Sequence, residues 1–370
     1  MNIGFDEQIF GLQSRGGISR YFAEIGRAMQ THGVRVMCAP GMHVNMHLAR
    51  PGFKVSGLYV QSYHKALANK IRRGNAAYSD FYLRRAEIDV LHETYYRPDE
   101  GDRHAGLVPR VVTVHDLIHE IFAAEYSPND KVAATMRAAV QRADHVICVS
   151  ERTRQDLVDR FGTPVGKTSV VHHGISELDA FQVLLPPGPP FFLFVGNRQG
   201  YKNFESLLRA FAASPSLRRD LRLVAFGGGV AQTSEITLIQ SLGLSVGQAA
   251  GNVAFVGGDD GILGAHMGAA LAMVYPSRYE GFGMPPLEAM HMGCPVVCSK
   301  ASVMPEVLGD APYYVDPDDV DDIRRALEEV KDSSTLRADL IQRGRQRAGL
   351  YSWQRCADET LAVYRQVLGA

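Results

Sequence analysis

The sequence is poor in the features that mark extracellular and membrane-spanning proteins. Its 370 residues contain five cysteines, an odd and small number that argues against a disulfide framework. The most apolar stretch, residues 262–275, is interrupted by Gly264 and His266 and is too short to span a bilayer. The opening residues MNIGFDEQIFGLQSRGG have no basic segment followed by an apolar one, so they predict no signal peptide. We therefore expect a protein of a reducing, cytoplasmic compartment.

An excess of charge of one sign is also lacking. Lys and Arg total 39 and Asp and Glu total 40, which gives a net charge of −1. This balance excludes a dedicated nucleic-acid coat and leaves room only for local basic patches. Cys294 and Cys298 are four positions apart, but no second pair has metal-ligand spacing, and the apolar residues between them are typical of a buried strand. We expect neither a metal site there nor a nucleic-acid partner.

Short β-rich runs alternate with helical patterns along the whole chain. Continuous apolar runs such as VVTV and FFLFV are typical of parallel strands that are covered on both faces, and the alternation predicts doubly wound α/β sheets. The predicted strands are Asn2–Phe5, Val34–Ala39, Ile88–His92, Arg110–His115, His145–Ser150, Thr168–His172, Phe191–Gly196, Leu221–Phe226, Asn252–Gly257, Ala270–Tyr275, Pro295–Ser299 and Pro312–Val315.

A proline-rich segment divides the chain. The sequence LLPPGPP at Leu184–Pro190 cannot be helix interior or central strand, and a new strand follows it directly. We predict one domain at residues 1–180, a second at 181–352 and a separate helix at the C-terminus. The predicted helices are Ile18–Met29, Pro128–Arg142, Arg152–Phe161, Asn203–Ala213, Val320–Val330, Ser334–Ala348 and Trp353–Leu368.

Two loops of the first domain could bind a ligand. In SRGGIS, Gly16 and Gly17 follow the first strand and open a helix, which suits close approach of an anion, although an ordinary tight turn fits equally well. In VVTVHDLIHE, His115 and Asp116 stand at the carboxyl end of a buried strand, where ligands of α/β sheets bind. His119 lies four positions after His115, but no third metal ligand is evident, and a structural histidine at a strand end is the main alternative.

The second domain carries two further loops. In VGNRQGYKN, Gly196 and Gly200 keep the turn open, and Arg198 and Lys202 are expected to project into one crevice mouth and neutralise a diphosphate. Two solvated surface cations are the alternative. In YPSRYEGFGMPPLEAMHMGCPVV, Glu280 lies on a glycine-rich loop and Glu288 is predicted in the first turn of the next helix. Carboxylates accept hydrogen bonds from sugar hydroxyls, and free N–H groups suit phosphate oxygens.

These motifs, in this order, resemble those of the retaining nucleotide-sugar glycosyltransferases of family 4. The matching segments are GGIS, VTVHD, VGNRQGYKN and EGFGMPPLE, supported by VVHHGIS and SVMPEVLGDAPYYVDPDD. The resemblance covers essentially the full length. It implies the GT-B fold, in which two Rossmann-like domains face each other across a cleft. It further implies that residues 181–352 hold the donor, that residues 1–180 hold the acceptor, and that helix 353–370 packs back on the first domain.

The resemblance also implies roles for individual residues. The residues expected to act in catalysis are His115, Glu280, Arg198 and Lys202. The residues expected to hold the donor are Gly16, Gly17, Gly196, Arg198, Lys202, Val256, Gly257, Glu280, Gly281, Phe282, Gly283, Met284 and Glu288. The acceptor is assigned to Tyr95, Tyr96 and Asp116. The family needs no metal for the leaving diphosphate and no cofactor besides its nucleoside-diphosphate sugar. One departure is Asn197, which separates Gly196 from Arg198 where many members have a glycine–arginine pair.

The resemblance is strongest to bacterial surface-polysaccharide mannosyltransferases, through FDEQIF, GGISRYFAEI and the GNR and KN of the phosphate loop. It implies transfer of mannose from GDP-mannose to a glycan or polyprenyl-linked glycan in polysaccharide or lipopolysaccharide biosynthesis. No protein nucleophile is evident, so retention suggests attack from the face that the diphosphate leaves. A UDP- or other sugar nucleotide, and a non-catalytic GT-B binding subunit, are the alternatives. A nucleotide-dependent oxidoreductase is disfavoured because the first strand is not followed by G-x-G-x-x-G.

One basic stretch suggests a membrane partner. Residues 63–85 interleave lysine and arginine with aromatic and aliphatic residues at helical spacing. Such a helix can lie on the anionic inner face of the cytoplasmic membrane. The alternative is a surface helix whose apolar side packs on its own domain.

Overall fold

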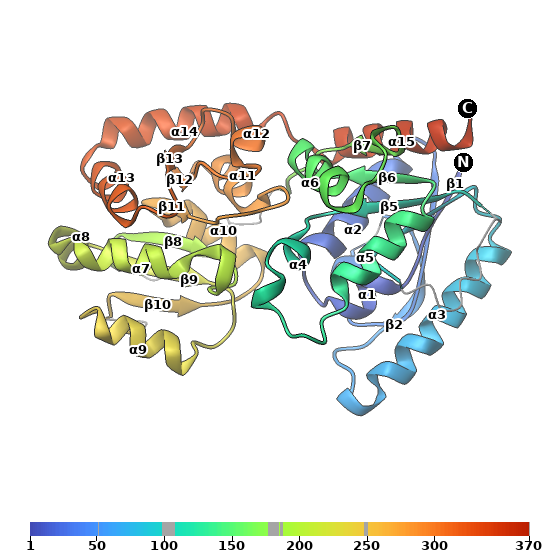
Figure 1. Ribbon diagram of the computed structural model, residues 1–370, viewed down its shortest axis with the longest axis horizontal. Coiled ribbons are helices and arrows are strands. Elements are labelled where there is room, and N and C mark those ends of the chain that lie inside the picture. The colour runs from blue at the N-terminus through green and yellow to red at the C-terminus, as the bar shows by residue number, and fades with distance from the viewer. Residues whose placement is uncertain (51, 98–107, 177–184, 186–187, 248–250, 370) are drawn as a thin grey trace. The chain divides into compact units, whose positions relative to one another are not determined.

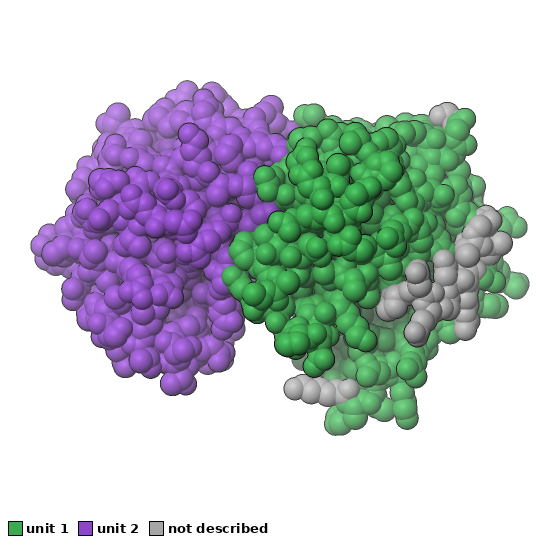
Figure 2. Space-filling view, in the orientation of Figure 1, with its two compact units in different colours: residues 1–174, 351–370 green, residues 175–350 purple. Residues whose placement is uncertain are grey.

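The structure is a computed structural model, and it describes residues 1–50, 52–97, 108–176, 185, 188–247 and 251–369 (Figure 1). The chain forms two compact units, of residues 1–174 with 351–370 and of residues 175–350 (Figure 2). The prediction put the first boundary six residues later, at 180, and three of the seven residues of the proline-rich break at Leu184–Pro190 lie outside the described residues. Each unit is described by itself.

Unit 1 is a seven-stranded parallel sheet with the order β3-β2-β1-β4-β5-β6-β7. The strand order reverses between β1 and β4, which is the switch point where ligands of open α/β sheets bind. The strands are β1 (Asn2–Phe5), β2 (Arg35–His43), β3 (Lys54–Tyr59), β4 (Val90–Glu93), β5 (Arg110–Val114), β6 (His145–Cys148) and β7 (Thr168–Val170).

The helices of unit 1 bury one face each. In α2, Tyr21, Phe22, Ile25 and Met29 are fully buried, which explains the 3.6-residue period of this segment. A second signal is capping: Ser150 accepts a hydrogen bond from the Thr153 N–H and starts α6. The helices are α1 (Gln8–Leu12), α2 (Gly17–Gln30), α3 (Ala68–Arg85), α4 (Ile118–Ile121), α5 (Val132–Arg142), α6 (Glu151–Phe161) and α15 (Trp353–Leu368).

Helix α15 follows residues 175–350 in sequence but belongs to unit 1. Ser352 caps its first turn by accepting from the Arg355 N–H. Trp353, Cys356 and Tyr364 are buried, and the Tyr364 hydroxyl shares a hydrogen bond of 2.6 Å with Nδ1 of His92 on β4. Figure 1 shows this helix, in red, alongside the strands of the N-terminal half. Its position on the first domain is the one that the family resemblance implies.

Unit 2 is a six-stranded parallel sheet with the order β10-β9-β8-β11-β12-β13, so its switch point lies between β8 and β11. Its strands are β8 (Phe191–Val195), β9 (Arg222–Phe226), β10 (Val253–Val256), β11 (Ala272–Tyr275), β12 (Val296–Ser299) and β13 (Tyr313–Val315). Its helices are α7 (Phe204–Ala213), α8 (Pro215–Asp220), α9 (Thr233–Ser241), α10 (Asp260–Ala269), α11 (Met284–His291), α12 (Met304–Leu308), α13 (Val320–Asp332) and α14 (Ser334–Ala348).

A core of large side chains holds α7 and α13 against this sheet. Phe192 and Phe194 of β8 pack in one cluster with Phe211 of α7 and with Ile323 and Leu327 of α13. Burying each such side chain contributes about 1.5–3 kcal/mol. The cluster therefore fixes β8, and with it the loop that follows β8 at the switch point.

The predicted fold class is confirmed, since both units are doubly wound α/β sheets. Each of the twelve predicted strands is present to within a few residues at its ends, and among the described residues β3 is the strand that the prediction missed. Within the described part of the chain, no helix combines the length and apolarity that crossing a membrane requires.

Candidate active site

The switch point of unit 2 brings together two residues that are 78 positions apart. Lys202, on the loop after β8, donates a hydrogen bond from Nζ to Oε1 of Glu280 at 2.6 Å and another to the hydroxyl of Tyr275 at 2.8 Å. The side chains of Lys202 and Glu280 are 12% and 10% exposed. The predicted cation and the predicted carboxylate therefore form an ion pair at the edge where the sheet should bind its ligand.

The backbone around Lys202 is fixed by unusual conformations. Gly196 has φ +132°, which side-chain-bearing residues rarely adopt. Asn203 has φ +59° and donates from Nδ2 to the carbonyl oxygens of Pro276 at 3.2 Å and Pro317 at 2.6 Å. This asparagine joins the loop after β8 to the loop after β11. The sequence reasoning missed its role, although asparagine is one of the few residue types besides glycine that adopt the left-handed conformation routinely.

The glycine-rich loop after β11 is also anchored. Ser302 donates from Oγ to the carbonyl oxygen of Glu280 at 3.0 Å. Gly283 has φ +92° and precedes α11. Gly281 and Phe282 are buried, and Met284 begins the helix.

The position of Glu288 differs from the prediction. The prediction placed this residue in the first turn of its helix, but α11 begins at Met284, so Glu288 lies in the second turn. The reason is that the left-handed Gly283 ends the loop early and both prolines fall inside the first turn, where Pro285 and Pro286 lose no hydrogen bond. Glu288 is buried, at 4% exposure.

Arg198, the second cation predicted for this loop, has partners of its own. Its Nε donates to Oε1 of Glu235 at 2.8 Å, and its Nη2 donates to the carbonyl oxygen of Gly229 at 3.2 Å. Its guanidinium also lies 4.7 Å from the ring centroid of Phe255, and its side chain is 2% exposed. The two cations therefore have separate partners, and the assignment of Arg198 to a diphosphate stays a prediction.

Arg198 finds its partners at a turn of three consecutive glycines that follows β9. Gly227, Gly228 and Gly229 have φ +89°, +71° and +73°, and their carbonyl oxygens accept from Arg198. The next helix, α9, contributes Glu235, whose carboxylate also accepts from the Gln232 N–H at 2.7 Å. The sequence reasoning missed this loop, and three consecutive glycines after a buried strand were the available signal.

Val256 and Gly257 lie next to that turn. Val256 ends β10, and its carbonyl oxygen accepts from the Gly227 N–H at 2.9 Å. Gly257 is exposed, and nothing lies within 4 Å of where a Cβ would be. Both residues are thus at the carboxyl edge of the sheet, where the prediction put the base of the nucleotide.

In unit 1 the two glycines of SRGGIS open α2 as predicted. Gly17 is its first residue, and Gly16 precedes it with an extended φ of 175°. A Cβ on Gly16 would lie 2.3 Å from Oε1 of Gln13, and this same oxygen accepts from the Ser19 N–H at 3.2 Å. The Gln13 side chain therefore caps the helix start, and a side chain at position 16 would have to displace it.

His115 directly follows β5 and is buried, at 9% exposure. Its ring stacks on His173 with a centroid distance of 5.4 Å, and Nδ1 lies 3.4 Å from Nε2 of His173. Burial lowers the pKa of His115 to about 3, so the imidazole is neutral at pH 7. Within the described residues its buried Nε2 has no hydrogen-bond partner. The sequence reasoning assigned no role to His173, although the VVHHGIS motif contains it.

His119 does not share a helix face with His115. It lies in α4, where Nδ1 is 2.9 Å from Oδ2 of Asp130, whereas His115 precedes the helix. Nowhere in the described residues do three or more His, Cys, Asp or Glu side chains form a group that could hold a metal ion.

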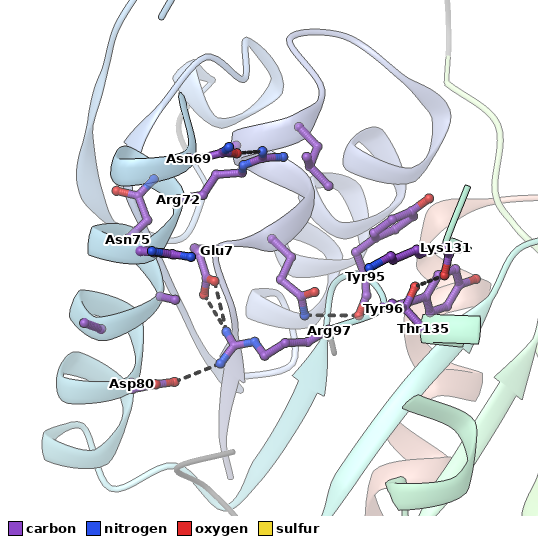
Figure 3. Close-up of a pocket in the computed structure, with 16 residues that line it drawn as sticks. Glu7, Asn69, Arg72, Asn75, Asp80, Tyr95, Tyr96, Arg97, Lys131 and Thr135 are labelled. Carbon is purple, nitrogen blue, oxygen red and sulfur yellow. Dashed lines mark hydrogen bonds and ion pairs between the residues drawn. The ribbon is translucent and has the colours of Figure 1, made fainter. Parts of the chain in front are cut away.

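A cavity of about 980 Å³ opens at the switch point of unit 1 (Figure 3). Its lining comes from the segments after β1 and β4, from α3 and from the start of α5. Tyr95 and Tyr96, predicted to contact the acceptor, both line it, and their rings lie 4.6 Å apart. The third predicted residue, Asp116, does not line the cavity, and its Oδ1 accepts from the Ile118 N–H at 3.0 Å.

Comparison with known proteins identifies both halves of the chain. Residues 15–177 match the family model described as Glycosyltransferase Family 4, and residues 176–347 match the one described as Glycosyl transferases group 1. The chain is 30% identical over 270 residues to the O-antigen chain mannosyltransferase B of Escherichia coli. The aligned segment covers 69% of this chain and 70% of the relative.

Solved structures share the fold at low identity. Sucrose-phosphate synthase from Thermosynechococcus elongatus has a TM-score of 0.76 at 21% identity, covering 100% of this chain and 99% of that one. Anabaena HepE in complex with UDP and glucose has a TM-score of 0.71 at 16% identity, covering 99% of this chain and 100% of that one. The family models, the 30% identical relative and the two parallel-sheet units together show that the chain belongs to the family 4 glycosyltransferases of the GT-B fold.

Proposed function

We propose that this protein is a retaining, metal-independent hexosyltransferase that transfers mannose from GDP-mannose to a glycan or polyprenyl-linked glycan in polysaccharide or lipopolysaccharide biosynthesis. The observation that carries the proposal is the Lys202–Glu280 pair at the switch point of unit 2. A cation and a carboxylate side by side suit the diphosphate and the sugar hydroxyls of a sugar nucleotide, which supports the proposal. The choice of mannose is supported by the relative whose name describes it as an O-antigen chain mannosyltransferase.

The diphosphate requires positive charge when it leaves. In the proposed mechanism, Nζ of Lys202 exchanges Glu280 for an oxygen of the diphosphate, and the positive end of the α11 dipole adds partial charge. Because Pro285 and Pro286 have no N–H, Met284 is the one residue of the first three in α11 with a backbone donor. Glu280 is then free to accept hydrogen bonds from the hydroxyls of the donor sugar. Charge stabilisation by this lysine and by a helix end takes the place of a metal ion.

His115 is suited to hold the sugar rather than to move a proton. With a pKa of about 3, its ring is neutral, and Nε2 is available for a hydrogen bond to a sugar hydroxyl. We therefore assign the proton of the acceptor hydroxyl to the leaving phosphate oxygen. The acceptor oxygen bonds to the anomeric carbon on the face from which the diphosphate departs, so the bond to the diphosphate breaks and the configuration is retained.

The donor is tested by incubating the full chain with GDP-mannose, UDP-glucose and other sugar nucleotides in the presence of EDTA. The expected result is release of GDP from GDP-mannose, with the configuration of the product read by NMR. HepE, which was solved with UDP and glucose, supports a UDP-sugar as the second candidate. Turnover of UDP-glucose but not of GDP-mannose would show that the donor is a UDP-sugar. If no nucleotide is released from any of the sugar nucleotides, the result would indicate a non-catalytic subunit.

We also propose that α3 makes peripheral contact with an anionic membrane. Lys70, Arg84 and Arg85 are exposed on this helix, and Phe81 is 65% exposed. The opposite face packs on the unit through residues such as Leu83, as the alternative of a surface helix predicted. The exposed face is the part of the helix that we propose meets the membrane. Flotation with anionic vesicles should recover the wild type and lose a variant with Lys70→Glu, Arg84→Glu and Arg85→Glu. Equal recovery would remove the membrane contact.

A further inference from the structure

The cavity of unit 1 has room for more than one sugar. Its volume of about 980 Å³ is at the upper end of the range of small-molecule sites. Figure 3 shows Asn69, Arg72, Asn75 and Asp80 on the α3 wall, with Tyr95, Tyr96 and Lys131 across from it. A ligand in the cavity would thus meet side chains from both walls.

The charges around the cavity are unbalanced. Its lining has four cations, Arg72, Arg73, Arg97 and Lys131, and two carboxylates, Glu7 and Asp80. Both carboxylates are already engaged by one cation, since Arg97 lies 2.9 Å from Oε2 of Glu7 and 3.2 Å from Oδ1 of Asp80. The remaining three cations have no carboxylate partner among the described residues.

The three cations come from two separate elements. Arg72 and Arg73 lie on α3, and Lys131 immediately precedes α5. Arg72 bonds the Asn69 side-chain oxygen, while Arg73 and Lys131 have no such side-chain bond in the described part of the chain. The first turn of α5 adds the positive end of a helix dipole on the side of the cavity where Lys131 lies. All three line one cavity, which distinguishes them from isolated surface charges.

Most neutral polar groups of the cavity are already bonded within the protein. Gln8 donates from Nε2 to Oδ2 of Asp6 at 2.6 Å, and Asn75 accepts from the Met42 N–H at 3.0 Å through Oδ1. The Thr135 hydroxyl donates to the Lys131 carbonyl oxygen at 3.0 Å. The groups that remain for a ligand include the three cations, the side-chain amide nitrogen of Asn69, and the hydroxyl and ring of the half-buried Tyr95.

We propose that this cavity binds a phosphorylated sugar, whose phosphate is held by Arg72, Arg73 and Lys131 and whose ring lies against Tyr95. A phosphate matches the charge and the donor groups that the walls leave open, and an aromatic ring offers an apolar face to a sugar. In identifying this ligand with the acceptor, the inference rests on the proposed function. The substrate class would then be a phosphate-bearing glycan.

The test is calorimetric titration of the full chain with a hexose 6-phosphate in the presence of saturating GDP, with the neutral hexose and inorganic phosphate as comparison ligands. The wild type should bind the hexose phosphate at least tenfold more tightly than either comparison ligand. A variant with Arg73→Gln and Lys131→Gln should lose at least tenfold in affinity. Its matched control, with Arg35→Gln and Arg160→Gln, removes two exposed cations of unit 1 outside the cavity and should bind as the wild type does.

Three outcomes would overturn the inference. The first is equal affinity of the wild type for the hexose phosphate and the neutral hexose. The second is unchanged affinity for the hexose phosphate in the Arg73→Gln and Lys131→Gln variant. The third is that Lys202→Ala abolishes binding of the hexose phosphate whereas the cavity variant still binds it. The last result would place the probe in unit 2. GDP-mannose binding, measured on the same cavity variant, should be unchanged, so a failure of this inference is distinguishable from a failure of the proposed donor site.

Discussion

Arg198 and Lys202 are four positions apart on one loop, yet they differ in what surrounds them. Arg198 is almost fully buried and holds the triple-glycine turn through several carbonyl oxygens and Glu235. Lys202 forms an ion pair with Glu280 and keeps some exposure. We therefore expect Arg198 to matter first for the stability of the loop and Lys202 first for the ligand.

Replacement of Arg198 by alanine should lower the free energy of unfolding by about 3–5 kcal/mol, because it leaves the Glu235 carboxylate without its cation and removes the donor of the glycine carbonyl oxygens. Urea unfolding monitored by circular dichroism measures this loss. Arg209→Ala is the matched control, since its pair with Glu205 is solvent-exposed and contributes under about 1 kcal/mol. Equal losses in the two variants would contradict the structural role of Arg198.

The sequence places single residues better than it places their contacts. His115, Lys202 and Glu280 were predictable site candidates because each stands after a buried strand of a parallel sheet. The contact of Lys202 with Glu280 and that of Arg198 with Glu235 join residues 78 and 37 positions apart. Side-chain partners at such separations depend on how the loops pack, which a local pattern does not contain.

At the scale of elements, α15 shows how closely a helix can approach a loop. A Cβ on Gly174 would lie 2.2 Å from the backbone nitrogen of Trp353, the first residue of the helix. Only glycine permits this approach. The limits of α15 were predicted correctly because Ser352 caps the start and Gly369, with φ +71°, ends it.

Gly174→Ala should therefore displace the start of α15 and lower the midpoint of thermal unfolding by several degrees. The added methyl meets backbone atoms, which cannot turn aside as a flexible side chain could. Gly166→Ala is the control, because nothing lies within 4 Å of a Cβ at that position. Differential scanning calorimetry compares the two, and an unchanged midpoint for Gly174→Ala would contradict the described packing.

The elements that the sequence missed have weak patterns. Strand β3, KVSGLY, lies at a sheet edge and is half-buried or exposed along its length, so it lacks an apolar run. Helix α10, DGILGAHMGA, contains three glycines and runs into the apolar residues of the next strand. Helix α9 has β-branched residues and buries only Ile239. Edge position and mixed composition hide such elements from periodicity.

At the scale of the whole molecule, buried histidines make stability depend on pH. Burial lowers the pKa of His92 and of His115 to about 3, and it lowers that of His173 well below its ordinary value. Between pH 6.5 and about 3 the unfolded chain binds protons that the folded chain does not. The contribution of these neutral histidines to the free energy of unfolding is therefore fully present above pH 6.5 and is lost as the pH falls.

The free energy of unfolding should accordingly fall between pH 7.5 and pH 5, by up to about 1.4 kcal/mol per pH unit for each histidine below its unfolded pKa. Urea titrations at several pH values measure the slope. His92→Gln, which removes one of these groups, should give a shallower slope than the wild type. A slope that the substitution leaves unchanged would show that His92 is not buried in its neutral form.

The central claim is that the switch point of unit 2 holds the diphosphate of a sugar nucleotide through Lys202. Calorimetric titration of GDP-mannose into the wild type, Lys202→Ala and Lys300→Ala tests it most directly. Lys300 is an exposed lysine of the same unit and serves as the control. We predict that Lys202→Ala weakens binding at least tenfold and that Lys300→Ala binds as the wild type does. Equal affinity of Lys202→Ala and the wild type would contradict the account.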